Sequence, residues 1–244
     1  GSNKMKKISL LFFSMFFFFS PILSQAQDNT RSVIRFVNCT IDDGFTFDEV
    51  VEKAKKLDFG ENSPNAVFFR RPIYATDSLM ENVDITIAAY YSNHSEMVER
   101  RVALGADSRG NLPINCRAPT VWRSYSVNQG AGPFEQTAML THLCTLNDGV
   151  TPRSAFNRIS TIAANYANAG DDSLVQMNIP SLGGGDNQRN FYLAVVGSSR
   201  ENLTRQLDMR FDGLRPELGN NSVSSFSCET PNLWSTTTIY SVNN

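Results

Sequence analysis

The sequence has 244 residues, of which 22 are basic, 24 are acidic and 41% are hydrophobic. A slightly acidic chain lacks the positive charge that attracts phosphate backbones, so nucleic acid is excluded as an expected partner. The length allows either one large domain or two of about a hundred residues each.

Residues 1–26 have the pattern of an expression-tag remnant followed by a secretory signal peptide. Lysines precede an apolar run from Ile8 to Leu23, and small residues stand at Ser24 and Ala26. The run is also about as long as a short transmembrane helix, but Pro21 and the small residues favour export with cleavage after Ala26. Removing the three lysines of this segment leaves 19 basic and 24 acidic residues, a net charge near −5. We therefore expect a periplasmic or extracellular protein with no stable membrane span.

Four cysteines follow the leader, at positions 39, 116, 144 and 228. In an exported chain an even number of cysteines predicts disulfides, because the compartment is oxidising. Four cysteines can form two disulfides in three different ways.

Two motifs occur twice in the same order. "VNCTIDDGFT" from Val37 matches "HLCTLNDGVT" from His142, and "CRAPTVW" from Cys116 matches "CETPNLW" from Cys228. This arrangement predicts a tandem duplication, with units 31–127 and 137–243. The segment 128–136 between them contains two glycines and a proline and is predicted to be a linker.

The first unit begins with a predicted strand, Arg31 to Thr40, followed by an Asp-Gly turn. Thr46 and Glu49 form a capping box, which predicts a helix start. The further predicted elements are strands at Ala66 to Arg70 and Ile85 to Tyr91, a helix over 93–104, and a last strand from Val121 to Val127.

The second unit repeats this order. Thr151 followed by Pro152 predicts the start of its first helix. Its predicted strands are Met139 to Thr145, Ser173 to Asn178, Phe191 to Gly197 and Leu233 to Tyr240, with a second helix over 198–211. Each unit therefore has the order βαββαβ, the ferredoxin-like split arrangement of an α+β protein.

This topology selects one disulfide pairing. The first and last strands of such a unit are antiparallel neighbours, so the end of the first lies beside the start of the last. Cys39 and Cys116 occupy these places in one unit, and Cys144 and Cys228 occupy them in the other. Redox or zinc-binding roles are less well supported, because there is no Cys-x-x-Cys motif and no set of spaced ligands.

Two ferredoxin-like units in one chain resemble the dimeric α+β barrel superfamily in topology and duplication, over the whole mature chain. The repeated C-T-[IL]-[DN]-D-G-x-T and C-x-x-P-x-x-W motifs are not signatures of a characterised enzyme. That superfamily includes NIPSNAP-like proteins and antibiotic-biosynthesis-type monooxygenases. The resemblance implies that the two units pack sheet against sheet as a pseudo-dimer within one chain, with a groove between them. It transfers no catalytic residues.

Side-chain alternation assigns the two faces of the sheets. One face of the third strands is apolar in both units and is predicted to lie under the helices: Ile85, Ile87, Ala89, Phe191, Leu193 and Val195. The opposite face, which includes Tyr90 and Tyr192, is predicted to look toward the other sheet.

Candidate ligand-binding residues are the polar and aromatic side chains predicted near the space between the sheets. They are Arg35, Tyr90, Trp122, His142, Tyr192 and Trp234. His142 aligns with Val37 and so breaks the repeat symmetry, which favours an acquired site; an ordinary buried or solvent-facing histidine is the alternative. The two tryptophans are symmetric, which favours packing over ligand stacking.

Three functions follow as hypotheses. The first is non-catalytic binding of a small molecule or an envelope partner in the groove, since the sequence shows no nucleophile-base pair, metal cluster or cofactor fingerprint. The second is a cofactor-independent monooxygenase or isomerase that uses His142, Arg35 and Tyr90. The third is a structural or assembly protein of the envelope. No cofactor and no metal is expected for any of them.

Overall fold

The computed structural model describes residues 31–104, 110–130, 135–183, 189–211 and 225–242. The predicted leader lies outside these residues. In the part of the chain that is described, no helix is both long and apolar enough to span a bilayer.

The first half of the chain contains five strands and three helices in its described residues. They are β1 (Arg31–Ile41), α1 (Phe47–Ala54), β2 (Ala66–Tyr74), α2 (Asp77–Asn82), β3 (Ile85–Tyr91), α3 (His94–Leu104), β4 (Ile114–Cys116) and β5 (Thr120–Ser126).

The second half repeats the order without a counterpart of α2 among its described residues. Its elements are β6 (Gln136–Leu146), α4 (Pro152–Asn168), β7 (Leu174–Leu182), β8 (Asn190–Val196), α5 (Arg200–Phe211), β9 (Phe226–Cys228) and β10 (Asn232–Ser241). The predicted strands and helices are therefore present, and α2, β4 and β9 are additional.

Each half has the ferredoxin-like strand order. The ladders run β2-β3-β1-β5 in the first half and β7-β8-β6-β10 in the second, with every pairing antiparallel. The short strands β4 and β9 pair with the ends of β1 and β6.

The two sheets join edge to edge. β5 pairs with β7 and β10 pairs with β2, which closes the ladders into an eight-stranded antiparallel barrel. The predicted space between the two sheets is therefore closed along both edges by strand pairing, which the sequence did not predict. An edge strand leaves a row of backbone donors and acceptors unpaired, and closure pairs both edges of both sheets.

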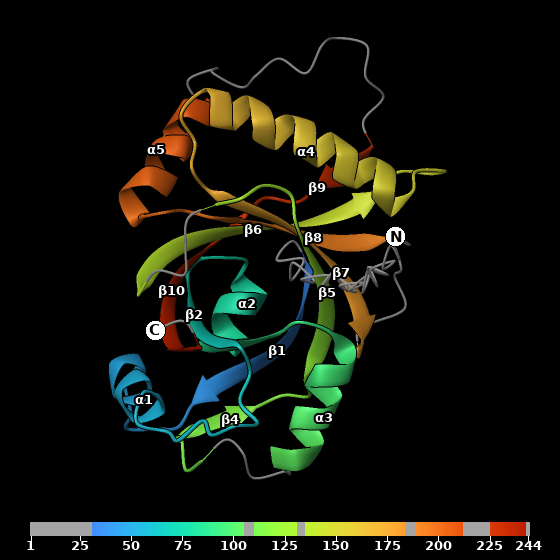
Figure 1. The fold of residues 1–244 in the computed structure, drawn as a ribbon. Helices are drawn as coiled ribbons and strands as arrows, with labels where there is room; N and C mark the ends of the chain where they lie inside the picture. The colour runs from blue at the N-terminus through green and yellow to red at the C-terminus, as the bar shows by residue number, and fades with distance from the viewer. Residues whose placement is uncertain (1–30, 105–109, 131–134, 184–188, 212–224, 243–244) are drawn as a thin grey trace, which may run out of the picture.

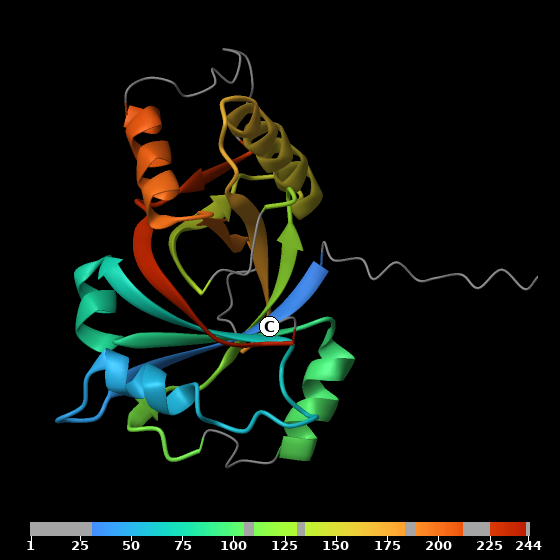
Figure 2. The same ribbon diagram turned by 60° about the vertical axis from the view of Figure 1, so that its left-hand side comes forward.

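The helices cover the outside of the barrel, with α1 and α3 on the first half and α4 and α5 on the second (Figures 1 and 2). Under α1 and α3 lies a core that includes Val33, Val50, Ala54, Ile85, Ala89 and Met97, and under α4 and α5 one that includes Leu140, Ala155, Ile159, Phe191, Val195 and Leu203. The predicted face assignment of β3 and β8 is thus confirmed. Burying each large apolar side chain of this kind stabilises the fold by about 1.5–3 kcal/mol.

The repeated ten-residue motif is a strand end, a tight turn and a helix N-cap in both halves. Gly44 and Gly149 have φ values of 87° and 74°, which favour glycine because it lacks a Cβ. Thr46 and Glu49 form the predicted capping box, and Thr151 accepts a hydrogen bond from the Ser154 backbone N–H. Local chemistry therefore fixes this segment in both halves.

Both predicted disulfides are present, Cys39–Cys116 and Cys144–Cys228. In each, the two cysteines are direct register partners. The prediction placed the second cysteine of each pair at the start of the last long strand. It lies instead on the short strand β4 or β9, because a proline separates the short strand from the long one. Two disulfides indicate that the chain folds in an oxidising environment.

The helix α2 lies within the ring of strands in Figure 1. Its Leu79 packs against Met139, Ala194 and Trp234, which line the barrel interior. α2 therefore covers part of one end of the barrel.

We expect removal of one disulfide to destabilise the protein without changing its topology. Each bond joins residues 77 or 84 positions apart, and loss of such a link typically lowers the free energy of unfolding by about 2–5 kcal/mol. Urea denaturation of Cys39→Ala/Cys116→Ala and of the matched Cys144→Ala/Cys228→Ala variant measures this. Peptide mapping that found pairs crossing between the halves would contradict the fold.

Candidate functional site

The barrel offers two kinds of surface that could hold a ligand, the interior and the helix-covered outside. Register partners in an antiparallel ladder point to the same face, and neighbours along a strand alternate. The register therefore assigns each predicted residue to one of these surfaces.

Tyr90, Trp122, Tyr192 and Trp234 face the interior, as predicted for the space between the sheets. Tyr90 and Trp122 are both register partners of Ile34. Trp234 pairs with Met139, which in turn pairs with Val196.

These interior aromatic residues form two sets of ring contacts, and Trp234 lies apart from both. The ring centroids of Trp122 and Tyr192 lie 4.9 Å apart, and those of Phe36 and Trp122 lie 6.4 Å apart. The rings of Phe68 and Tyr90 meet edge to face at 5.4 Å. Trp234 lies with Met139 and Ala194 instead, and its Nε1–H donates to the Thr141 hydroxyl over 2.8 Å.

Arg35 and His142 point to the outside of the barrel, contrary to prediction. Arg35 pairs with Ala89 and His142 pairs with Leu193, both on the helix-covered face. The prediction assumed that polar side chains avoid this face. The helices cover these two positions only in part, so a polar side chain there still reaches solvent.

The catalytic set His142, Arg35 and Tyr90 is therefore not assembled. Tyr90 lies on the interior face, whereas His142 and Arg35 lie outside and on different halves. A mechanism that needs all three together has no support in this fold.

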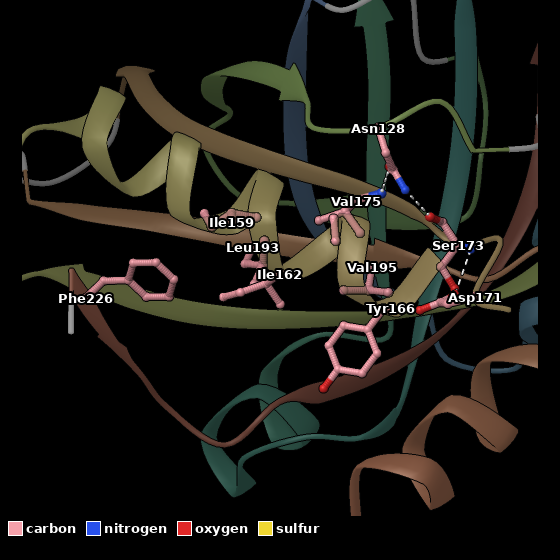
Figure 3. Close-up of a pocket in the computed structure, with 11 residues that line it drawn as sticks. Asn128, Ile159, Ile162, Tyr166, Asp171, Ser173, Val175, Leu193, Val195 and Phe226 are labelled. Atoms are coloured by element: carbon pink, nitrogen blue, oxygen red, sulfur yellow. Dashed lines mark hydrogen bonds between the residues drawn. The ribbon is translucent and has the colours of Figure 1, made fainter. Parts of the chain in front are cut away.

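A cavity of about 80 Å³ lies between α4 and the outer face of the second half (Figure 3). The lining residues are Asn128, Ile159, Ile162, Ala163, Tyr166, Asp171, Ser173, Val175, Leu193, Val195 and Phe226. We call it the α4 pocket. Its walls are mostly aliphatic, from α4 on one side and from β7 and β8 on the other.

One end of the α4 pocket is polar and tightly held. The side-chain amide of Asn128 donates to the Ser173 carbonyl and accepts from the Val175 N–H, each over 2.8 Å. The Asp171 carboxylate accepts from the Ser173 N–H at 2.8 Å. The Ser173 hydroxyl is buried and has no hydrogen-bond partner.

The difference between the halves explains why the second provides this pocket. α4 runs from Pro152 to Asn168, whereas α1 ends at Ala54. In the first half Phe59, from the segment after α1, packs against the corresponding core and stacks on Tyr240 at 4.4 Å.

Sequence reasoning missed the residues of this pocket and also Arg70, which is buried in the barrel interior. The pocket residues are ordinary apolar positions with no distinguishing pattern. Arg70 had a signal, because Arg70 and Arg71 are adjacent on a strand and must point to opposite faces. Because one face of this strand lines the barrel interior, one of the two has to be enclosed.

Among the described residues no group of three or more histidine, cysteine or acidic side chains could hold a metal ion.

No family model matches the sequence, and no curated protein matches it. Solved structures do resemble the fold. A mutant chlorite dismutase from Candidatus Nitrospira defluvii has a TM-score of 0.50 at 10% identity, with 84% of this chain and 91% of that chain covered. A second mutant of that enzyme has a TM-score of 0.50 at 9% identity, covering 85% and 92%. A putative monooxygenase from Lactobacillus acidophilus NCFM has a TM-score of 0.48 at 9% identity, covering 86% and 94%.

At these identities the likeness concerns the fold. The chain has a mixed α+β architecture built on a closed antiparallel barrel, in common with the chlorite dismutase structures. A shared fold does not by itself imply a shared chemistry.

Tyr192 gives the interior a measurable signature. Burial, and less strongly the Glu229 carboxylate, raise the pKa of its phenol above 10.0. The neutral phenol is thereby favoured in the folded state, so this stabilisation is complete below the unfolded pKa and is lost as pH rises through the folded pKa.

We expect the free energy of unfolding to fall less steeply above pH 10 in Tyr192→Phe than in the wild type. Urea denaturation at a series of alkaline pH values checks this, with Tyr74→Phe at an exposed position as the control for loss of a phenol. Identical slopes in wild type and Tyr192→Phe would show that this phenol is not enclosed.

Proposed function

We propose that this chain is an exported binding protein that holds a small, neutral, mostly apolar molecule in the α4 pocket. In this proposal the signal peptide is removed after Ala26 and the mature chain is a pseudo-dimer formed by tandem duplication. The matching strand order of the two halves supports the duplication.

The α4 pocket carries the proposal, and above all the Ser173 hydroxyl at its polar end. Leaving a buried hydroxyl without a partner costs about 1–3 kcal/mol. A ligand that offered one hydrogen-bonding group to Ser173 would remove this cost while its apolar part contacted Ile159, Ile162 and Val195.

The size and charge of the α4 pocket limit the ligand. An apolar cavity of about 150 Å³ accepts benzene, so a space of about 80 Å³ fits a smaller molecule or one end of a longer chain. The lining residues include no cation and one carboxylate, Asp171, which disfavours an anion. A neutral alcohol, aldehyde or amide with a short hydrocarbon part meets these conditions.

Filling the pocket should abolish binding. In Ile162→Phe the larger ring occupies the cavity, whereas Thr161→Phe places the same ring on the exposed face of α4. We expect 1-butanol to shift the amide resonances of Val175 and Leu193 in the wild type and in Thr161→Phe, but not in Ile162→Phe.

Ser173→Ala tests the polar end separately. It should weaken butanol binding roughly threefold to tenfold, in line with the loss of one neutral hydrogen bond. Butanol that bound equally well to Ile162→Phe would show that the α4 pocket is not the site.

A second candidate function is proton-transfer catalysis at this pocket, favoured by the position of His142. His142 is the register partner of Leu193, which lines the α4 pocket, and both side chains lie on the same face. In this second proposal the His142 imidazole acts as a general base toward a substrate in the pocket, as an isomerase or a cofactor-independent oxygenase requires.

If His142 is the base, His142→Gln should lower turnover roughly a hundredfold or more in a substrate screen, because a positioned base typically contributes 10²–10⁴-fold. Circular dichroism and butanol binding should remain unchanged in the variant. Full activity in His142→Gln would leave ligand binding as the function of the pocket.

A further inference from the structure

The barrel interior encloses one arginine. Arg70 pairs with Thr86 on β3 and with Thr236 on β10, so its side chain points inward. Only 6% of its surface is exposed. By register, Arg70 is the one charged side chain on the interior face of the described strands.

The groups that contact the Arg70 guanidinium are neutral. Its Nη2 donates to the Tyr90 hydroxyl over 2.7 Å, and its guanidinium carbon lies 5.2 Å from the ring centre of Phe36 and 6.0 Å from that of Tyr90. Its Nε–H has no hydrogen-bond partner. None of the ion pairs between described residues includes Arg70.

A buried charge of this kind is costly. Cation-π contacts and one neutral hydrogen bond offset part of the desolvation, but proteins usually pair an enclosed guanidinium with an anion. In the part of the chain that the structure describes, no acidic side chain pairs with Arg70.

A second polar atom without a partner lies across the ladder from Arg70. The Thr236 hydroxyl, on a side chain that is 5% exposed, has no hydrogen-bond partner. The equivalent pair at the other junction of the halves, Ser124 and Asn178, also contains unpaired polar atoms but no charge. The positive charge therefore distinguishes the first junction from the second.

We propose that Arg70, Thr236 and Tyr90 form a binding site for an organic monocarboxylate inside the barrel. The Nε–H of Arg70 and the two hydroxyl groups supply donors to a carboxylate, which accepts several hydrogen bonds. One positive charge balances one negative charge, so a monoanion is preferred to a dianion. The rings of Phe36 and Phe68 suit an apolar body better than an inorganic ion.

This site is separate from the α4 pocket, which lies on the outer face of the other half. α2 covers the nearer end of the barrel through Leu79 on Trp234, and none of its own residues is buried. A ligand therefore reaches Arg70 by displacing a short helix that contributes little to the core.

Titration calorimetry with sodium acetate and sodium benzoate tests the site, at constant ionic strength maintained with sodium chloride. The wild type and Arg71→Gln, in which the neighbouring arginine on the outer face is changed, should bind at least one of the two carboxylates equally well. Arg70→Gln should bind it roughly tenfold more weakly or worse, the usual loss for a hydrogen bond to a charged group.

Thr236→Val keeps the charge and the shape and should bind roughly threefold or more weakly. It replaces Arg70→Gln as the decisive variant if the latter does not fold. Failure of both carboxylates to bind the wild type, or equal binding by Arg70→Gln and Arg71→Gln, would overturn the proposal. A response to sodium nitrate alone would overturn the choice of an organic carboxylate. Because butanol binding at the α4 pocket is independent of Arg70, these results do not depend on the function proposed above.

Discussion

The rest of the structure depends on the two antiparallel ladders that join the halves, β5 with β7 and β10 with β2. Each half alone would end in two unpaired strand edges, and the joined halves have none in the eight-stranded ring. Closure also builds the interior, because the inward-facing side chains of both halves then enclose a single space. The interior aromatic residues and Arg70 are enclosed as a consequence of these ladders.

The two junctions share an irregularity that closure needs. The register shifts between Val121 and Trp122 at one junction and between Leu233 and Trp234 at the other. Bulges of this kind bend a strand and increase its twist, which allows a sheet to curve into a barrel. The repeated C-x-x-P-x-x-W motif thus marks the disulfide, the break after the short strand and the bulge in each half.

Local signals in the sequence were sufficient to predict most of the elements and both disulfides. These signals include the N-cap residues Thr46 and Thr151, the turn glycines and the alternation in β3. Each acts within a few residues, so it can be recognised without knowing which distant strand the segment pairs with. The way in which the halves meet could not be predicted in this way, because edge-to-edge and face-to-face packing bury similar apolar strands. The faces of Arg35 and His142 were assigned from polarity, which fails where helices leave the outer face partly open.

The two candidate sites lie where the two halves differ. The longer helix α4 opens a neutral pocket on the second half, where the first half has Phe59. Arg70 occupies the position at which the second half has Asn178, and it brings a charge to one junction.

Native-state hydrogen exchange measured residue by residue tests the closed barrel most directly. The amides of β2, β5, β7 and β10 at the two junctions should be as strongly protected as those of β1 and β3 within one half, because each junction strand is paired on both sides like a strand inside one sheet. Junction amides that exchanged through a separate, lower-energy opening would show that the halves are independent sheets in contact, and would contradict the account.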